Sequence, residues 1–323
     1  MGQVTRWGIL GAAKFAAQHM GPAIHQAEAA KLVALATSTA EKSNEFKAFC
    51  PDLKILDSYD TLLADPGIDA VYIPLPNHLH VAWTTKALRA GKHVLCEKPI
   101  AMRADEIDAL IALRDETGKL AAEAYMIVHH PQWLRARDLL RDGAIGDLVH
   151  VQGHFSYDNR ADPGNIRNRP ETGGGAIRDI GVYPYGATRF VTGQEPTALR
   201  ARIAYENGVD TYSQVSADFD GFSAVFTVSM RMSLFQEMTF HGTQATLRLS
   251  APFNPGPYGE ARVELRRADG SLQIDRFPAA QQYKLQVENF GRAIRDGAEY
   301  PCPLEFTRGT QAMIDLALAK LTD

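Results

Sequence analysis

In one stretch of the sequence, a predicted buried strand is followed within two residues by a lysine. The apolar run 93–96 is typical of a strand that is buried on both faces of a parallel sheet. Pro99 cannot continue that strand, so Glu97 and Lys98 are placed at its carboxyl end, where open α/β sheets bind their ligands. An ammonium there is costly unless it is paired or used. A solvated lysine at a strand end is the alternative interpretation.

A second stretch could supply the acid and base that an amine alone does not. Three consecutive glycines, 173–175, are followed by a predicted helix that carries Asp179 and Tyr183 four residues apart, hence on one face. A carboxylate and a phenol on one face can serve as an acid–base pair. Such pairs also occur by chance on helix surfaces, so the spacing alone leaves both interpretations open.

The beginning of the chain has the pattern of a dinucleotide-binding unit. A strand over residues 4–10 is followed by a turn of small residues and a helix to about His25. Gly11 fits the first glycine of the dinucleotide fingerprint, but Ala13 and Ala16 take the second and third places. An ordinary strand–helix turn is the alternative. The cofactor contacts predicted for this turn are Gly11, Ala12, Ala13, Lys14 and Phe15.

The ends of the next strands add further cofactor contacts. The strand over residues 32–36 ends in three hydroxyl residues with a lysine nearby and no acid before Glu41, which suits a 2′-phosphate. We therefore predict NADP in preference to NAD, although the hydroxyls could instead cap the following helix. His78 and His80 have a spacing compatible with metal ligation, but no acid or cysteine cluster accompanies them, so no metal is predicted. The contacts predicted from these strand ends are Thr37, Ser38, Lys42, Pro74, Asn77, His78, Glu97 and Lys98.

The elements that carry these residues change character near residue 131. Up to that point strands alternate with helices of about ten residues or more, which predicts a doubly wound parallel Rossmann sheet in residues 1–124. Residues 125–323 contain several strand-like runs with period-2 alternation and short turns, which predicts an α+β domain with a large, mostly antiparallel, open-faced sheet. A final helix is expected over residues 306–321. The fold class is therefore α/β, in two domains.

Composition excludes several classes of partner. A net charge of −4 argues against a nucleic-acid partner, and no apolar run approaches the length of a membrane span. The start of the chain fits neither a myristoylation site, because Arg6 replaces the required hydroxyl residue, nor a signal peptide. Three cysteines without paired or metal-like spacing indicate reduced thiols and a cytoplasmic location.

Taken together, these stretches resemble the glucose–fructose oxidoreductase, inositol dehydrogenase and MocA family over nearly the whole chain. The resemblance lies in residues 8–13, the Glu97-Lys98-Pro99 motif, the segment from Gly173 to Tyr183, and the stretches 165–167 and 287–290. A tyrosine at 183, where many members have histidine, is similar to the dimeric dihydrodiol dehydrogenase and NADP-dependent xylose dehydrogenase branch. Ile127 and Val128 depart from the Tyr-Arg that often follows the methionine matching Met126, which weakens the transfer of a substrate from the family.

The resemblance implies a hydride transfer between a nicotinamide and a sugar, polyol or dihydrodiol. It gives Lys98 the place of the catalytic lysine and Asp179 that of the substrate-orienting acid, and we expect Tyr183 to exchange the hydroxyl proton. Glu97 is expected to point away and to pair structurally, since consecutive strand residues face opposite sides. The segment expected to contact a carbohydrate-like substrate contains Asn165, Arg167 and Arg169. The alternatives are a redox-assisted glycoside hydrolase that retains NAD and a non-catalytic sensor. The uncovered sheet face predicts a homodimer or homotetramer.

Overall fold

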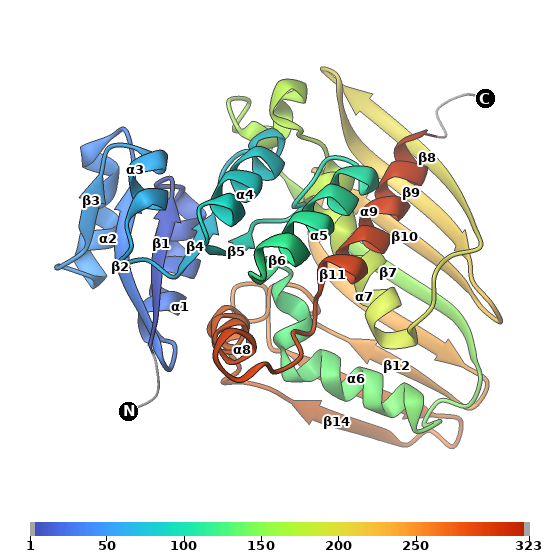
Figure 1. Ribbon diagram of the computed structural model, residues 1–323. Coiled ribbons are helices and arrows are strands. Elements are labelled where there is room, and N and C mark those ends of the chain that lie inside the picture. Colours follow the sequence, from blue (N-terminus) through green and yellow to red (C-terminus); the bar gives the residue numbers. More distant parts are fainter. Residues whose placement is uncertain (1–3, 320–323) are drawn as a thin grey trace. The chain divides into compact units, whose positions relative to one another are not determined.

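The computed structural model describes residues 4–319 and divides into two compact units (Figure 1). The first unit contains the described residues up to His129 together with Gln281–Arg308, and the second contains His130–Ala280 together with the described residues from Gly309 onward. The predicted division after residue 124 did not include the return of residues 281–308 to the first unit. Residues 1–3 and 320–321, which entered the predictions for the chain start and the final helix, lie outside the described residues.

The first unit is built on a six-stranded sheet in the order β3-β2-β1-β4-β5-β6, and all its strand pairs are parallel. The chain leaves β1 for β2 and β3 on one side and returns to β4 on the other, so the order reverses between β1 and β4, where doubly wound sheets bind ligands. This confirms the predicted fold class of the N-terminal half. The strands are β1 (Thr5–Leu10), β2 (Ala30–Ala36), β3 (Lys54–Leu56), β4 (Ala70–Ile73), β5 (His93–Cys96) and β6 (Ala121–Glu123).

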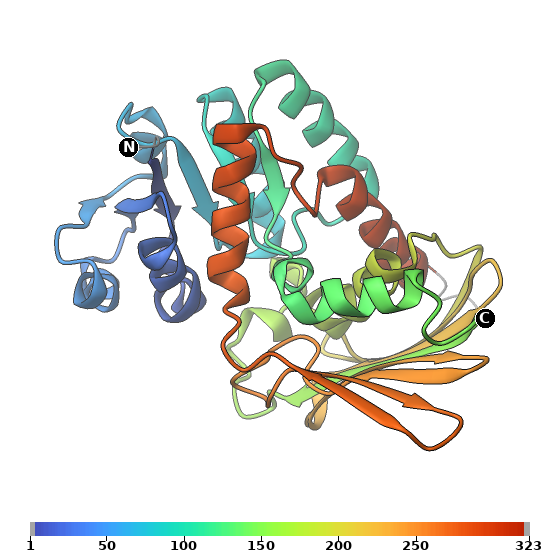
Figure 2. The same cartoon turned by 90° about the horizontal axis from the view of Figure 1, so that it is seen from below.

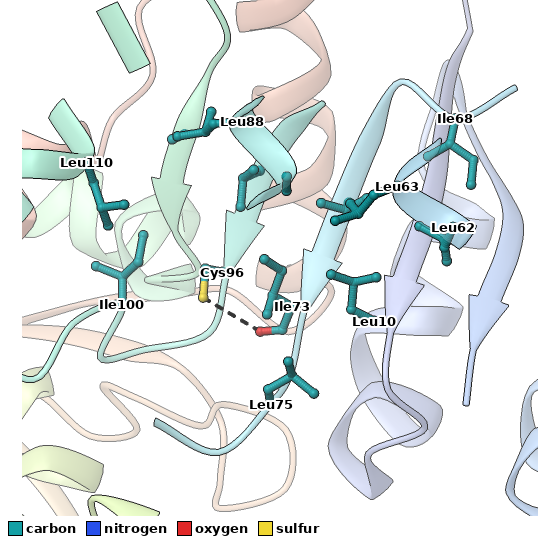
Figure 3. Close-up of a cluster of buried hydrophobic side chains, with 14 of the residues drawn as sticks. Leu10, Leu62, Leu63, Ile68, Ile73, Leu75, Leu88, Cys96, Ile100 and Leu110 are labelled. Atoms are coloured by element: carbon teal, nitrogen blue, oxygen red, sulfur yellow. Dashed lines mark hydrogen bonds between the residues drawn. The ribbon is translucent and has the colours of Figure 1, made fainter. Parts of the chain in front are cut away.

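The core of this unit is apolar because its strands are covered on both faces. All four residues of β4 are buried, and Figure 3 shows Leu10, Ile73 and Cys96 from three neighbouring strands within one cluster that also includes Leu110 of α5. The thiol of Cys96 donates to the carbonyl of Ile73 at 3.8 Å. The helices are α1 (Gly21–Gln26), which continues a π-helical segment at Ala16–Met20, α2 (Asn44–Phe49), α3 (Tyr59–Ala64), α4 (His80–Arg89), α5 (Ala104–Thr117) and α8 (Gln282–Asp296).

Two features of the first unit differ from the sequence expectation. The strand expected over residues 120–126 is only β6, and a 3₁₀ turn follows at Met126–His129. Helix α8 was not predicted. Its Phe290 packs against Trp7 of β1, with ring centroids 5.1 Å apart, and its Tyr283 packs edge-on against Phe15 at 5.5 Å. A contact between segments so far apart in the chain has no local signal.

The second unit contains an eight-stranded sheet in the order β14-β13-β12-β11-β7-β10-β9-β8. Its strand pairs are antiparallel except for β7 with β10, which confirms the predicted mostly antiparallel sheet. The strands are β7 (Leu148–Asp158), β8 (Ala198–Glu206), β9 (Val209–Asp218), β10 (Ser223–Ser229), β11 (Arg231–Gly242), β12 (Ala245–Leu249), β13 (Arg262–Arg267) and β14 (Leu272–Arg276).

Helices of the second unit lie on one face of this sheet. Figure 2 shows α6 (Pro131–Arg141, green) above the strands, and α7 (Val182–Thr192) packs against both α6 and β7. No helix among the described residues of this unit covers the opposite face. Helix α9 (Leu304–Ala319) ends the described chain. Among residues 4–319, no helix combines the length and the apolar character that crossing a membrane requires.

Candidate active site

The turn after β1 requires a glycine. Gly11 has φ +106° and donates its N–H to the carbonyl of Ala36 at 2.9 Å. A Cβ at this position would lie 3.0 Å from a methyl of Leu75 and 3.2 Å from the Tyr59 hydroxyl. The chain turns helical at Lys14, so unpaired N–H groups of the helix start stand beside this turn. This is the arrangement that binds the phosphates of a dinucleotide.

The end of β2 presents hydroxyl groups and no acid. Thr37 is buried, and its hydroxyl accepts the N–H of Thr39 at 3.2 Å, whereas Ser38 and Lys42 are exposed. Thr39 makes no capping hydrogen bond to the turn that follows. The hydroxyls therefore do not serve as the helix cap that was the alternative interpretation of this segment.

The loop after β4 separates the two histidines that could have bound a metal. His78 is exposed in a 3₁₀ turn at Asn77–Leu79, whereas His80 is completely buried at the start of α4. Both ring nitrogens of His80 face backbone carbonyls, those of Pro99 and Leu75. Neither nitrogen is therefore directed at a metal.

Lys98 begins the turn that follows β5, and the Lys98–Pro99 peptide is cis. The carboxylate of Glu97 accepts the Tyr72 hydroxyl at 2.6 Å through one oxygen and the backbone N–H of Lys98 at 3.2 Å through the other. Burial, followed by the negative charge of Glu97, holds the pKa of Tyr72 well above its ordinary value, so the phenol stays a donor. Glu97 thus makes structural contacts of the kind that strand alternation predicted.

In the second unit, Asp179 lies at the centre of a polar group. It sits in a π-helical turn, Ile177–Gly181, that leads into α7, and its side chain is 12% exposed. One of its oxygens accepts the Tyr157 hydroxyl at 2.6 Å and lies 2.8 Å from the guanidinium of Arg167. The charge of Asp179 raises the pKa of Arg167, and burial together with Asp179 raises that of Tyr157. Arg167 therefore stays a cation and Tyr157 stays a donor.

Tyr183 is in the first turn of α7 and is 6% exposed. Its ring packs against Phe155 and Phe253, with centroids 5.6 and 5.5 Å away. Negative charge on Tyr183 would also raise the pKa of Arg167, so the two groups lie within electrostatic reach of each other. The phenol is thus in a largely apolar setting beside one strong cation.

The glycine run allows the segment that carries Arg167 to approach the helix. Gly174 and Gly175 donate their N–H groups to the carbonyls of Arg169 and Arg167, each at 3.0 Å. A Cβ at Gly174 would overlap the Arg167 carbonyl. The side chain of Asn165 accepts the Arg167 N–H at 3.1 Å, and the side chain of Arg169 is exposed. Of the three predicted substrate residues, Arg167 is the one brought to Asp179.

Two residues of this unit were missed by the sequence analysis. Tyr157 lies on β7 and Asp210 on β9, and neither belongs to the glycine segment that drew attention. Asp210 is 2% exposed and accepts the N–H of Ile177 at 2.6 Å, so it caps the helix that carries Asp179. A carboxylate at a helix start is favourable, but no local pattern shows which strand will supply it.

Comparisons with known proteins identify the family of this chain. Residues 5–125 match the family described as "Oxidoreductase family, NAD-binding Rossmann fold", and residues 133–248 match the "GFO/IDH/MocA C-terminal domain". An oxidoreductase of Rhizobium meliloti is 39% identical over 97% of this chain and 95% of its own length. The chain belongs to the Gfo/Idh/MocA family.

Two further relatives in this family have stated activities. A D-xylose 1-dehydrogenase (NADP⁺) of Haloferax volcanii is 33% identical, over 90% of this chain and 89% of its own length. The crystal structure of a 3-ketoreductase from Actinomadura kijaniata with NADP and TDP-benzene has a TM-score of 0.89 at 28% identity, and the match covers 98% of each chain. Such relatives favour a sugar oxidoreductase over a glycoside hydrolase or a non-catalytic sensor.

The residues of the first unit fit the NAD-binding function of this family. The crowding and the positive φ at Gly11 leave room only for a glycine where a pyrophosphate would approach the helix start. Within the described residues 37–42, the one acid is Glu41, so hydroxyls and Lys42 stand at the position that contacts the ribose in this fold. Lys98 belongs to the first unit, and Asp179 and Tyr183 belong to the second. That these three side chains meet stays a prediction.

Proposed function

We propose that this chain is an NADP-dependent oxidoreductase acting on a CH–OH group, or the corresponding carbonyl, of a sugar, polyol or dihydrodiol. The observation that carries the proposal is the contact of Tyr157 and Arg167 with Asp179, which lies in the helical segment that leads to Tyr183. A carboxylate fixed by a phenol and a guanidinium can orient a hydroxylated substrate by charge-assisted hydrogen bonds. Its position one helical turn before a shielded phenol suits proton exchange at the oxygen of that substrate.

The cofactor residues proposed for this function come from the first unit. Gly11 to Phe15 would hold the pyrophosphate, Thr37, Ser38 and Lys42 the 2′-phosphate, and Pro74, Asn77 and His78 the loop side of the dinucleotide. When bound, the nicotinamide supplies the hydride acceptor or donor. Because the segment 37–42 lacks an acid before Glu41, we propose NADP rather than NAD.

The protein's own groups have separate roles in the proposed reaction. Tyr183 accepts or returns the hydroxyl proton, and a phenol with an ordinary pKa of about 10 requires nearby cations to do so near neutral pH. Arg167 is one such cation within its own unit, and we propose Lys98 as the other. Asp179 orients the substrate hydroxyl.

The decisive test substitutes Lys98. We expect Lys98→Met to lower turnover at least about a hundredfold, which is the lower range for loss of an acid–base or electrostatic group, with little change in NADPH affinity. The substrate is identified first by an absorbance screen at 340 nm that pairs NADP and NAD with pentoses, hexoses, inositols and dihydrodiols. Exposed Lys47, on α2, gives the control variant Lys47→Met, which should turn over normally. Unaltered turnover of Lys98→Met would remove Lys98 from the mechanism.

We also propose that the uncovered sheet face joins two or four copies of this chain in the cytoplasm. Phe235 of β11 is 41% exposed on this face, where its ring meets His154 of β7 at 5.0 Å. An exposed aromatic side chain at the middle of a sheet gains free energy from burial against a partner. Sedimentation should give a dimer or tetramer that Phe235→Asp dissociates, whereas Leu316→Asp, on α9, should leave it intact. A monomeric wild type would refute the proposal.

The cysteines Cys50, Cys96 and Cys302 are buried and unbridged, in agreement with a reducing compartment.

A further inference from the structure

The turn that carries Lys98 is held by buried side chains, and we propose that one of them, His80, is a positioning residue that ties this turn to the cofactor loop. The inference rests on the proposed function, because it concerns the placement of the lysine that function uses. It assigns to His80 a role that neither the family motifs nor the spacing of the histidines indicated.

His80 bridges two segments that follow neighbouring strands. Its Nδ1 lies 2.7 Å from the carbonyl of Pro99, and its Nε2 lies 2.6 Å from the carbonyl of Leu75. Pro99 is the residue next to Lys98, and Leu75 lies in the loop between Pro74 and Asn77, which are proposed to contact the cofactor. The ring is completely buried at the first position of α4, so its position is fixed by packing and not by solvent.

Two acids complete the hold on the lysine turn. The N–H of Ile100 donates to Glu123 at 3.0 Å, and the N–H of Lys98 donates to Glu97 at 3.2 Å. Glu123 ends β6, and Glu97 follows β5. The backbone is therefore held on both sides of Pro99 by carboxylates, while His80 takes the carbonyl between them. The second contact of His80, to the carbonyl of Leu75, reaches the cofactor loop.

The protonation state of the His80 ring determines to how many carbonyls it can donate a hydrogen bond. A neutral imidazole donates one hydrogen bond, and an imidazolium donates two. Burial lowers the pKa of His80, its two carbonyl partners oppose that shift, and the neighbouring Lys98 and His78 add to the lowering. A side-chain amide, in contrast, does not titrate and has its N–H groups at one known position. Replacing His80 with an amide residue can therefore keep one contact, to Pro99 or to Leu75, and remove the other at any pH.

Asparagine and glutamine provide that separation. The amide nitrogen of asparagine occupies the place of Nδ1, and that of glutamine the place of Nε2, so His80→Asn keeps a donor for Pro99 and His80→Gln keeps one for Leu75. We expect His80→Gln to lower kcat about tenfold and to leave the Kd for NADPH within about threefold, as for one lost buried hydrogen bond. We expect the reverse for His80→Asn: a kcat reduced less than about threefold and a Kd for NADPH raised at least about fivefold. The kcat is measured on the most active sugar of the 340 nm screen, and NADPH binding by its fluorescence, below the unfolding temperature of each variant.

The outcomes separate this inference from the proposed function. Equal kcat values for the two variants, or a lower kcat for the asparagine variant, overturn the role of His80. An inactive Lys98→Met with wild-type turnover in both His80 variants refutes the inference alone. An active Lys98→Met refutes the proposed function, whatever His80 does.

A second pair of variants covers the case in which the His80 variants do not fold. Glu123→Gln keeps an acceptor for the Ile100 N–H, and Glu123→Met removes it. If the hydrogen bonds to the backbone around Pro99 fix the position of Lys98, kcat falls about tenfold in the methionine variant and stays within about threefold in the glutamine variant. Equal turnover in these two variants also overturns the inference.

Discussion

Each unit contains a phenol that donates a 2.6 Å hydrogen bond to a carboxylate, and the two units use that bond differently. In the first unit Tyr72 donates to Glu97, whose other oxygen accepts the next backbone N–H. In the second unit Tyr157 donates to Asp179, which also contacts the guanidinium of Arg167. The same bond therefore fixes a backbone turn in one unit and holds a charged group in the other.

The difference shows which groups position the Lys98 turn in the first unit and which position Asp179 in the second. Around the lysine turn, His80, Glu97 and Glu123 each make a hydrogen bond to a backbone group of residues 98–100, and these bonds determine the shape of the turn. Around Asp179 the partners are side chains, one of them a cation, so the charge and the direction of a carboxylate are determined instead. Removing the phenol hydroxyl should accordingly affect mainly stability at Tyr72 and mainly turnover at Tyr157.

The largest expected effect comes from two crowded glycines, one in each unit. Gly175 has φ +116°, and a Cβ there would overlap the carboxylate of Asp210, whereas Gly11 has φ +106° and would place its Cβ 3.0 Å from Leu75. We expect Gly175→Ala to cost about 3 kcal/mol of unfolding free energy, from backbone strain and overlap together. Gly11→Ala should cost about 1–2 kcal/mol and weaken NADPH binding about tenfold. Urea unfolding and NADPH titration measure both.

A third glycine is the control for that comparison. Gly118 has φ +62° with open space around it, so Gly118→Ala carries the backbone cost without the crowding. It should lower stability by about 1 kcal/mol and leave NADPH affinity unchanged. If Gly118→Ala is as harmful as Gly175→Ala, crowding is not the reason for the glycine at 175.

The second effect sharpens the contrast between the two phenols. Tyr72→Phe should lower the unfolding free energy by about 1–3 kcal/mol, because the half-buried carboxylate of Glu97 loses its 2.6 Å hydrogen bond from the phenol, and should change kcat little. Tyr157→Phe should lower kcat about tenfold, because Asp179 loses a charge-assisted bond, and should change stability by less than about 1 kcal/mol. Thermal unfolding and steady-state kinetics on both variants make the measurement. A greater loss of kcat in Tyr72→Phe would reverse the assignment.

The smallest expected effect is the pH dependence of Asp210. Burial raises the pKa of Asp210 above its ordinary 3.8, so the folded state binds this proton more tightly than the unfolded state. Its contribution to stability is therefore full below about pH 3.8 and is lost as the pH rises through the raised pKa of the folded state. Asp210→Asn keeps an acceptor for Ile177 and removes this loss, so its stability relative to wild type should grow with pH, within about 1 kcal/mol. Urea unfolding from pH 3 to 7 tests this, with exposed Asp220→Asn as the control; an unchanged difference across the range would contradict it.

The sequence was most informative where its signals are local. A buried strand, a turn and a helix occur in that order around Gly11, and a buried strand ends two residues before Lys98, so the parallel sheet and the position of Lys98 at its carboxyl edge were predictable. The period-2 alternation likewise indicated an antiparallel sheet in the second half. Helix α8 escaped prediction because its partner, Trp7, lies near the other end of the chain.

By itself, the sequence determined which residues could do chemistry and at which ends of strands and helices they lie, because strand burial, proline and glycine act within a few residues. Only the tertiary structure decided which side chains support them. Tyr157 and Arg167 reach Asp179 from a strand and a loop, Asp210 caps its helix from another strand, and His80 joins two loops of the first unit. These contacts depend on how sheets and helices pack, and packing brings together residues whose separation along the chain carries no signal.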